Sequence, residues 1–302
     1  MNSKSETARA WFVLVPLCFY FLAMRDLHAR ADDEYVGPAE LKKRVSKAFA
    51  VPKDCKSLHP ENRIWINRDE QIVIADGYVA QRQVPLELFA CPTGSKEHES
   101  IVAIFARAQS VHAGLLAINA KPGSPATFDP FKPATGTTVR IYVLWLDDEG
   151  NGKGTLAQNW IRRVGTQKCM YWDFVFAGSK IYKDDDGVEH YLGDSGELIS
   201  VSNFSTSTMD VAVKSDQANS NLLFEAFTER IPKRDTPIRL VMTLTDEPPF
   251  GSVDTGESSD KAKEPKYLSE EIPKNVMLYM PSVPKQAATT KATPTTQPSK
   301  DR

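Results

Sequence analysis

The chain has 302 residues, enough for one large domain or two modest ones, and its composition, 41% hydrophobic and 25% charged, is ordinary for a globular protein. Its 37 lysines and arginines nearly balance its 39 acids. This balance argues against a general nucleic-acid-binding protein, which would carry a basic excess, so we expect no nucleic-acid partner.

The first 31 residues are typical of a secretory signal peptide. Lys4 and Arg9 make the start positive, residues 11–24 are an unbroken apolar run, and residues 29–31 fit an A-x-A cleavage pattern. The run is shorter than the roughly 20 residues that a membrane-spanning helix needs, although an uncleaved anchor is the alternative. We expect cleavage near Ala31 and a mature protein, without a transmembrane segment, in the periplasm or outside the cell.

Residues 32–60 form a polar lead-in with one short amphipathic helix. Pro38 suits a first helical turn, and Leu41, Val45 and Phe49 then recur every four residues. This apolar stripe predicts that the helix docks on the main domain.

Residues 61–245 are predicted to form a single α+β domain built on an antiparallel sheet, with a helical pair after the first strands. Residues 64–83 have the pattern of a strand meander with a hairpin turn at Asp76-Gly77. The apolar spacings in residues 101–108 and 111–118 predict two successive helices. Most later segments alternate as strands do, while residues 222–230 favour a short helix. Because the helices come early and the strands late, alternating βαβ units are not expected.

Residues 246–302 have the composition of a low-complexity, largely disordered tail. The sequence V-M-L-Y-M at 276–280 is a small apolar island within it. This island could add a strand to a sheet edge or cover a groove.

The candidate site centres on residues 91–100, C-P-T-G-S-K-E-H-E-S. If a helix follows the turn at residues 92–94, its unsatisfied N–H groups would lower the pKa of the thiol that precedes it. A helical hairpin would also bring a histidine of the second predicted helix close. The candidate residues are Cys91, Lys96, Glu97, His98, Glu99 and His112.

Three of these residues suit a metal site. Cys91, His98 and His112, with a neighbouring glutamate, would form a ligand set for a single transition metal such as zinc or copper. The same stretch also has a purely structural interpretation: a turn, a capping Ser95, acids in a first helical turn and an apolar helix. No C-x-x-C, H-x-x-x-H or H-E-x-x-H spacing decides between the two.

Other polar groups are weaker candidates. No G-x-S-x-G elbow supports a serine nucleophile at Ser179 or Ser195 with His190. The D-D-D-G sequence at 184–187 lacks the pattern of a calcium loop and fits a hairpin turn. After signal cleavage Cys55, Cys91 and Cys169 remain, an odd number whose pairing the sequence leaves open.

Several stretches resemble those of bacterial YdjY-domain proteins: L-E-L-F-A-C-P-T-G-S-K-E-H-E-S, V-H-A-G-L-L-A-I-N-A-K-P-G, W-D-F-V-F-A-G-S, I-S-V-S-N-F and F-E-A-F-T-E-R-I-P. The similarity runs from about residue 64 to residue 245, and it places the six candidate residues within family-type motifs. The family is named mainly as a domain of unknown function, so the resemblance implies no catalytic residue. Some members are labelled ferredoxin-like or electron-transport-associated. An iron–sulfur cluster is not expected here, because it needs about four cysteines.

Three functions therefore remain open at this stage. The leading hypothesis is an exported, non-enzymatic module that binds a ligand, a metal or an envelope protein partner through the candidate site. The alternative is a thiol- or metal-dependent enzyme, or a redox protein, that uses Cys91, His98 and His112. The third is an envelope scaffold in which the motif only turns the chain.

Overall fold

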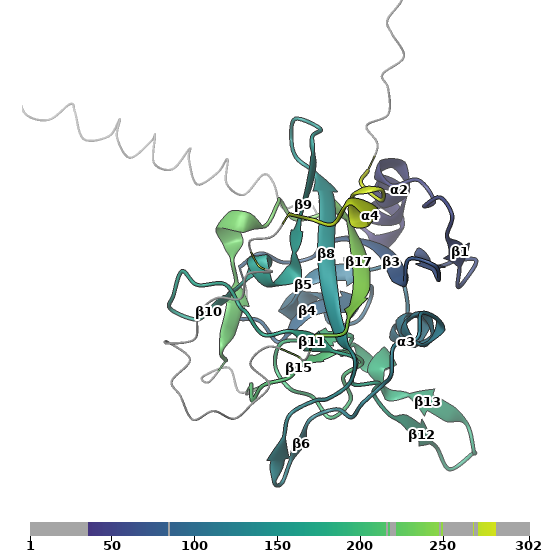
Figure 1. Cartoon of the computed structure of the whole chain (residues 1–302), viewed down its shortest axis with the longest axis vertical. Coiled ribbons are helices and arrows are strands. Elements are labelled where there is room, and N and C mark those ends of the chain that lie inside the picture. The colour runs from purple at the N-terminus through teal and green to yellow at the C-terminus, as the bar shows by residue number, and fades with distance from the viewer. Residues whose placement is uncertain are drawn as a thin grey trace, which may run out of the picture. The chain divides into compact units, whose positions relative to one another are not determined.

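The computed structural model describes residues 36–83, 85–215, 217, 222–247, 249, 268 and 271–281 (Figure 1). The predicted signal peptide and most of the predicted tail lie outside these residues. Contacts divide the chain into two compact units, Met1–Gly37 and Pro38–Arg302, and every element below belongs to the second. Among the described residues, no helix has both the length and the apolar character needed to cross a membrane.

A mostly antiparallel sheet of 11 strands forms the centre of the second unit. Its main path runs, in order, through β14 (Ile199–Ser200), β4 (Leu88–Pro92), β5 (Ser100–Ile104), β3 (Ile72–Val79), β17 (Pro237–Thr245), β8 (Thr138–Leu146), β11 (Phe174–Val175) and β15 (Asp210–Val211). The remaining strands pair beside this path: β2 (Ile64–Asn67) with β3, β1 (Lys56–Ser57) with β2, and β9 (Gly152–Leu156) with β8. The expected antiparallel, sheet-rich architecture is confirmed, with β4 and β5 as a parallel pair within it.

Shorter elements surround the sheet. Three hairpins or strand pairs are β6 (Thr127–Phe128) with β7 (Phe131–Lys132), β10 (Ile161–Arg163) with β16 (Phe224–Ala226), and β12 (Ile181–Lys183) with β13 (Glu189–Tyr191). The α-helices of the described residues are α2 (Pro38–Ala48), α3 (Ala108–Ala117) and α4 (Lys274–Met277). Single 3-10 turns are η1 (Glu97–Glu99), η2 (Ala157–Trp160), η3 (Leu192–Ser195) and η4 (Thr228–Arg230).

The first helix of the predicted helical pair, over residues 101–108, is not present. The segment that contains Ile101 and Ile104 is strand β5, whereas the second predicted helix is present as α3. All five residues of β5 are buried, because the strand lies between β4 and β3. A strand buried on both faces is apolar throughout, so its residues also satisfy a helical spacing. Residues 222–230, predicted as a helix, instead contain β16 and η4.

The predicted hairpin at Asp76-Gly77 is also wrong, because both residues lie inside β3. The chain turns earlier, between β2 and β3, where Asn67 pairs with Ile72 and Gln71 has a φ of 51°. Gly77 is needed for strand packing instead. A Cβ at this position would lie 2.1 Å from the carbonyl oxygen of Ala103 in β5.

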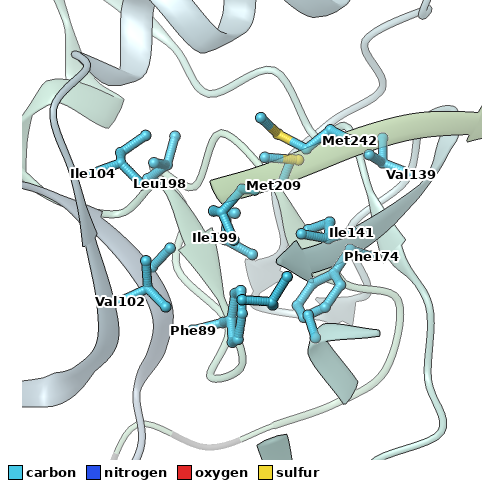
Figure 2. Close-up of a cluster of buried hydrophobic side chains, with 14 of the residues drawn as sticks. Phe89, Val102, Ile104, Val139, Ile141, Phe174, Leu198, Ile199, Met209 and Met242 are labelled. Atoms are coloured by element: carbon cyan, nitrogen blue, oxygen red, sulfur yellow. The ribbon is translucent and has the colours of Figure 1, made fainter. Parts of the chain in front are cut away.

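The two faces of the sheet bury different sets of side chains, since alternate residues of a strand point to opposite faces. Face A carries the larger cluster, in which Val73 and Leu240 pack with Val111 and Leu115 of α3. Figure 2 shows part of this cluster, where Phe89, Ile141, Phe174 and Met242 come from four strands. Face B carries a smaller cluster: Trp65, Ile72, Ile74, Tyr142, Leu144, Leu156 and Val241, covered by Val276 and Tyr279.

Residues 271–281 form a folded C-terminal segment on face B. Val276 is fully buried and Tyr279 is 6% exposed. Two glycines of β9 make room for this segment: a Cβ at Gly154 would lie 2.4 Å from Ile272 Cδ1, and one at Gly152 would lie 2.8 Å from Met280 Cγ. The apolar island therefore covers a sheet face, and this part of the predicted tail is ordered by apolar burial.

A buried ion network ties the outer segments to face B. The carboxylate of Asp76 is fully buried and accepts hydrogen bonds from Arg63 Nε at 3.0 Å and Arg239 Nε at 2.6 Å. The same two guanidinium groups donate to the carbonyls of Phe49, Ala50 and Tyr279. The network thus joins the end of α2 and the C-terminal segment to strands β2, β3 and β17. The predicted amphipathic helix is present as α2, with Leu41 and Val45 buried.

Candidate functional site

Cys91 lies in β4 and is fully buried, opposite Ala103 of the parallel strand β5. Only the single 3-10 turn η1 and strand β5 follow, so the expected α-helix amino terminus beside the thiol is absent. Burial raises the pKa of Cys91 to about 11, although the Ser100 hydroxyl opposes this effect. The expectation of a lowered thiol pKa is therefore wrong, and the group is a protonated thiol at neutral pH.

The turn after Cys91 is held by its own polar side chains. Ser95 Oγ donates to the carbonyl of Pro92 at 2.6 Å and so does not cap a helix. The Glu97 carboxylate accepts a hydrogen bond from the backbone N–H of Gly94, whose φ is +86°. Ser100 Oγ donates to the carbonyl of Lys96 at 2.8 Å. These bonds fix the position of Lys96, His98 and Glu99 at the surface.

Lys96 joins this turn to a distant part of the chain. Its Nζ lies 3.1 Å from Glu99 Oε1 and 2.9 Å from Glu197 Oε1. The ammonium group also lies 5.0 Å from the centre of the Phe204 ring, a cation–π distance. Gly196 packs against the lysine stem, because a Cβ there would lie 2.7 Å from Lys96 Cγ. Lys96 is therefore a fixed bridge between the turn and residues 196–204.

The surface around Lys96 has an excess of carboxylates. The pKa of Glu87 is raised, first by burial and then by the negative charge of Glu99, while Lys96 and His98 act in the opposite direction. Glu197 also contributes to this rise. We call Glu87, Lys96, His98, Glu99 and Glu197 the Lys96 surface. Its three carboxylates face one lysine and one histidine, so a negative field remains when the histidine is neutral.

His98 is the most accessible member of the Lys96 surface. Its side chain is 77% exposed, and Nε2 lies 3.7 Å from Glu99 Oε2. The Glu99 side chain is 19% exposed, because its carboxylate also contacts Lys96. His98 therefore projects beside a carboxylate that is already held in place.

His112 has a different set of neighbours. Its Nδ1 lies 3.0 Å from the Tyr191 hydroxyl, which in turn lies 2.9 Å from Thr208 Oγ1. The imidazole packs edge-on against the rings of Phe176 and Tyr191. Burial lowers the pKa of His112. These contacts describe a neutral histidine that holds α3 to β13 and to Phe176, the residue after β11.

The candidate residues therefore separate into four environments, one of them the packing of His112 against Tyr191 and Phe176. Within the described part of the chain, no group of three or more histidine, cysteine, aspartate or glutamate side chains has the geometry of a metal site. Cys91, His98 and His112 do not form such a set. Lys96, His98 and Glu99 do come together, while Cys91 lies in the core and Glu97 holds the turn. Cys55, Cys91 and Cys169, the cysteines of the described residues, form no disulfide with one another.

Sequence reasoning missed Glu197, Glu87 and Phe204 as members or supports of this surface. Glu197 lies about a hundred residues after Lys96, and it follows Gly196 in a stretch that has only turn character. The available signals were two similarities to family motifs: L-E-L-F-A-C-P-T-G-S-K-E-H-E-S contains Glu87, and I-S-V-S-N-F ends at Phe204.

Comparison with known proteins adds one finding to this geometry. The family model described as the YdjY domain matches residues 64–243, more than half of the chain. No curated protein and no solved structure matches the chain. The chain therefore belongs to the YdjY family.

Proposed function

We propose that this YdjY-family protein is an exported binding module of the cell envelope, and that its Lys96 surface receives a cationic segment of a protein partner. The observation that carries the proposal is the fixed, net acidic arrangement of Glu87, Glu99 and Glu197 around Lys96 and His98. Burial is the main cause of the raised pKa of Glu87, and a lysine or arginine from a partner would relieve the further rise that comes from repulsion by Glu99 and Glu197. Electrostatic complementarity of this kind favours association and the correct orientation of two proteins.

The geometry also favours binding over thiol chemistry. A thiol enzyme needs an accessible thiolate, whereas Cys91 is fully buried and its pKa is raised to about 11. The surface residues of the motif are instead polar or charged side chains, of which Lys96 and Glu99 are already paired with each other. Side chains fixed before association lose less conformational entropy when a partner binds.

Export is proposed from the sequence of the first 31 residues, which lie outside the described structure. Amino-terminal sequencing of the protein recovered from its cells tests this part. A mature chain that begins close to residue 32 supports export and cleavage. A chain that begins before Trp11 would refute cleavage.

A photo-crosslinking amino acid at position 98 tests the binding surface in cells. We expect a discrete cross-linked product, and we expect its yield to fall when Glu99→Gln is added, because the carboxylate that attracts the partner is removed. The matched control is position 190, whose histidine side chain is 51% exposed on the β12–β13 hairpin. No product at position 98, or the same product from both positions, would contradict the proposal.

A further inference from the structure

A second surface, around α2 and the C-terminal segment, is both basic and apolar. It is separate from the Lys96 surface, and the inference below does not depend on that surface. Three large apolar side chains are exposed there: Val51 by 64%, Met277 by 43% and Leu278 by 79%. A folded protein gains nothing from exposing apolar groups to water, and a concentration of them marks an interaction surface.

Contacts around one guanidinium group place these residues together. Arg239 donates to the carbonyl of Ala50, next to Val51, and to the carbonyl of Tyr279, next to Leu278. Cys55 Sγ lies 3.8 Å from the Tyr279 hydroxyl, so the loop from residue 50 to residue 55 passes around this ring. Figure 1 shows α2 and α4 side by side at one end of the domain. We call Val51, Lys53, Met277 and Leu278 the tip.

The surroundings of the tip are basic. Residues 38–57 contain six lysines and arginines and two acids, Glu40 and Asp54, although the whole chain has a net charge of −2. Most of these cations are exposed, including Lys43, Lys47 and Lys53. Glu40 lies near Lys43 and Arg44 only at 3.8 and 3.7 Å, distances at which exposed ion pairs contribute little. Lys274 adds a further exposed cation in α4, although the Glu70 carboxylate also lies beside this helix, 3.1 Å from Asn275 Nδ2, so the basic character is concentrated on the α2 side.

Exposed apolar side chains and exposed cations together indicate which kind of partner this surface binds. The cations would attract an acidic protein. Such a protein would also need a matching apolar pocket for each protruding side chain, such as Leu278. A bilayer with anionic headgroups satisfies both features, since lysines bind the headgroups while isolated apolar side chains enter the boundary with the acyl chains. From this charge and apolar complementarity, we propose that the tip and the basic face of α2 dock on an anionic phospholipid membrane surface.

Vesicle binding tests the proposal with the protein in the form recovered from its cells. We expect cosedimentation with vesicles of phosphatidylcholine and phosphatidylglycerol that decreases at high salt and with phosphatidylcholine alone. Lys47→Gln with Lys53→Gln should weaken the binding by about 25-fold, since each lysine near an anionic surface contributes about fivefold. Val51→Ser with Leu278→Ser should weaken binding at both salt concentrations, because the apolar contact is not screened.

A matched control comes from the β12–β13 hairpin, which lies at the other end of the domain in Figure 1. Ile181 is 68% exposed there, and the Lys183 side chain is 64% exposed. Ile181→Ser with Lys183→Gln should leave vesicle binding unchanged. Binding that ignores lipid charge, that survives both tip variants, or that the control variant weakens equally would overturn the proposal. Binding to the soluble polyanion heparin without binding to vesicles would overturn it in favour of another anionic partner.

Discussion

The two faces of the central sheet are covered by different parts of the chain. Face A is packed mainly by α3 and by strands that lie almost wholly within residues 64–243, the part that matches the family. Face B is covered by α2 and by residues 271–281, which lie outside that part. Face A is held mainly by apolar packing, whereas face B also contains the buried ion network of Asp76. In this chain, segments outside the part that matches the family therefore complete the second face of the sheet.

The largest expected effect comes from breaking the ion network of face B. Asp76→Ala leaves Arg63 and Arg239 without their common carboxylate, and Arg239 is 3% exposed. We expect a loss of about 3–5 kcal/mol in the free energy of unfolding, measured by urea denaturation, because the remaining charges stay buried. The control Asp148→Asn removes an ion pair with Lys233 whose side chains are each 74% exposed, and it should cost less than about 1 kcal/mol. Equal losses for the two variants would contradict this account of face B.

Adjacent residues of the C-terminal segment sharpen the comparison. Tyr279 is buried and its hydroxyl accepts a hydrogen bond from Asn67 Nδ2 at 3.1 Å, whereas Leu278 is 79% exposed. Tyr279→Ala should lower the free energy of unfolding by about 2–4 kcal/mol, since it removes both ring packing and this bond. Leu278→Ala should change it by less than about 0.5 kcal/mol. If Tyr279→Ala is as mild as Leu278→Ala, the segment does not complete the core.

Cysteine reactivity probes the burial of the strand that leads into the Lys96 surface. In the native protein, Cys91 should react with iodoacetamide on the order of a hundredfold more slowly than in urea, because a buried thiol reacts only after local opening. Cys55 is half-buried and provides an internal reference. Mass spectrometry of the modified peptides measures both rates. Alkylation of native Cys91 at the rate of a small free thiol would restore the thiol hypothesis.

The sequence alone predicted much of the fold, but not all of it. Alternation predicted most strands, and the spacing of Leu41, Val45 and Phe49 predicted α2. The spacing of apolar residues in 101–108 predicted a helix where strand β5 lies. A strand buried on both faces has no polar residues whose alternation would identify it as a strand. Asp76 was wrongly predicted to lie in a turn, because aspartate is common both in turns and in buried ion pairs. Its ion pairs with Arg63 and Arg239 form only in the folded structure, so the local sequence does not show them.

The candidate site was predictable in its location but not in its membership. The local motif identified Lys96, His98 and Glu99, whereas Glu197 and Phe204 join them through tertiary contacts. The place of Cys91 depends on whether the following segment is a helix or a strand. That choice reversed the direction of its pKa shift.

The smallest expected effect concerns Glu87, whose pKa is raised above the ordinary value of 4.5 in the folded protein. Below pH 4.5 the side chain is protonated in both the folded and the unfolded states and costs no stability. As the pH rises through the folded-state pKa, the charged form becomes unfavourable only in the folded state, so stability falls. Glu87→Gln should therefore stabilise the protein at pH 7 but not at pH 4, as measured by urea midpoints. A Glu87→Gln effect that does not change between these pH values would contradict the raised pKa of Glu87, which burial and then the neighbouring Glu99 produce.

The most direct test of the central claim is the accessibility of two exposed histidines of the protein in its native place in intact cells. His98 belongs to the proposed binding surface, and His190 lies on the β12–β13 hairpin. Diethyl pyrocarbonate modification can be compared, by mass spectrometry, between intact cells and the purified protein. We predict that His98 is modified several-fold less in cells while His190 is modified equally in both samples. Equal modification of His98 in both samples would show that nothing covers this surface and would contradict the proposed function.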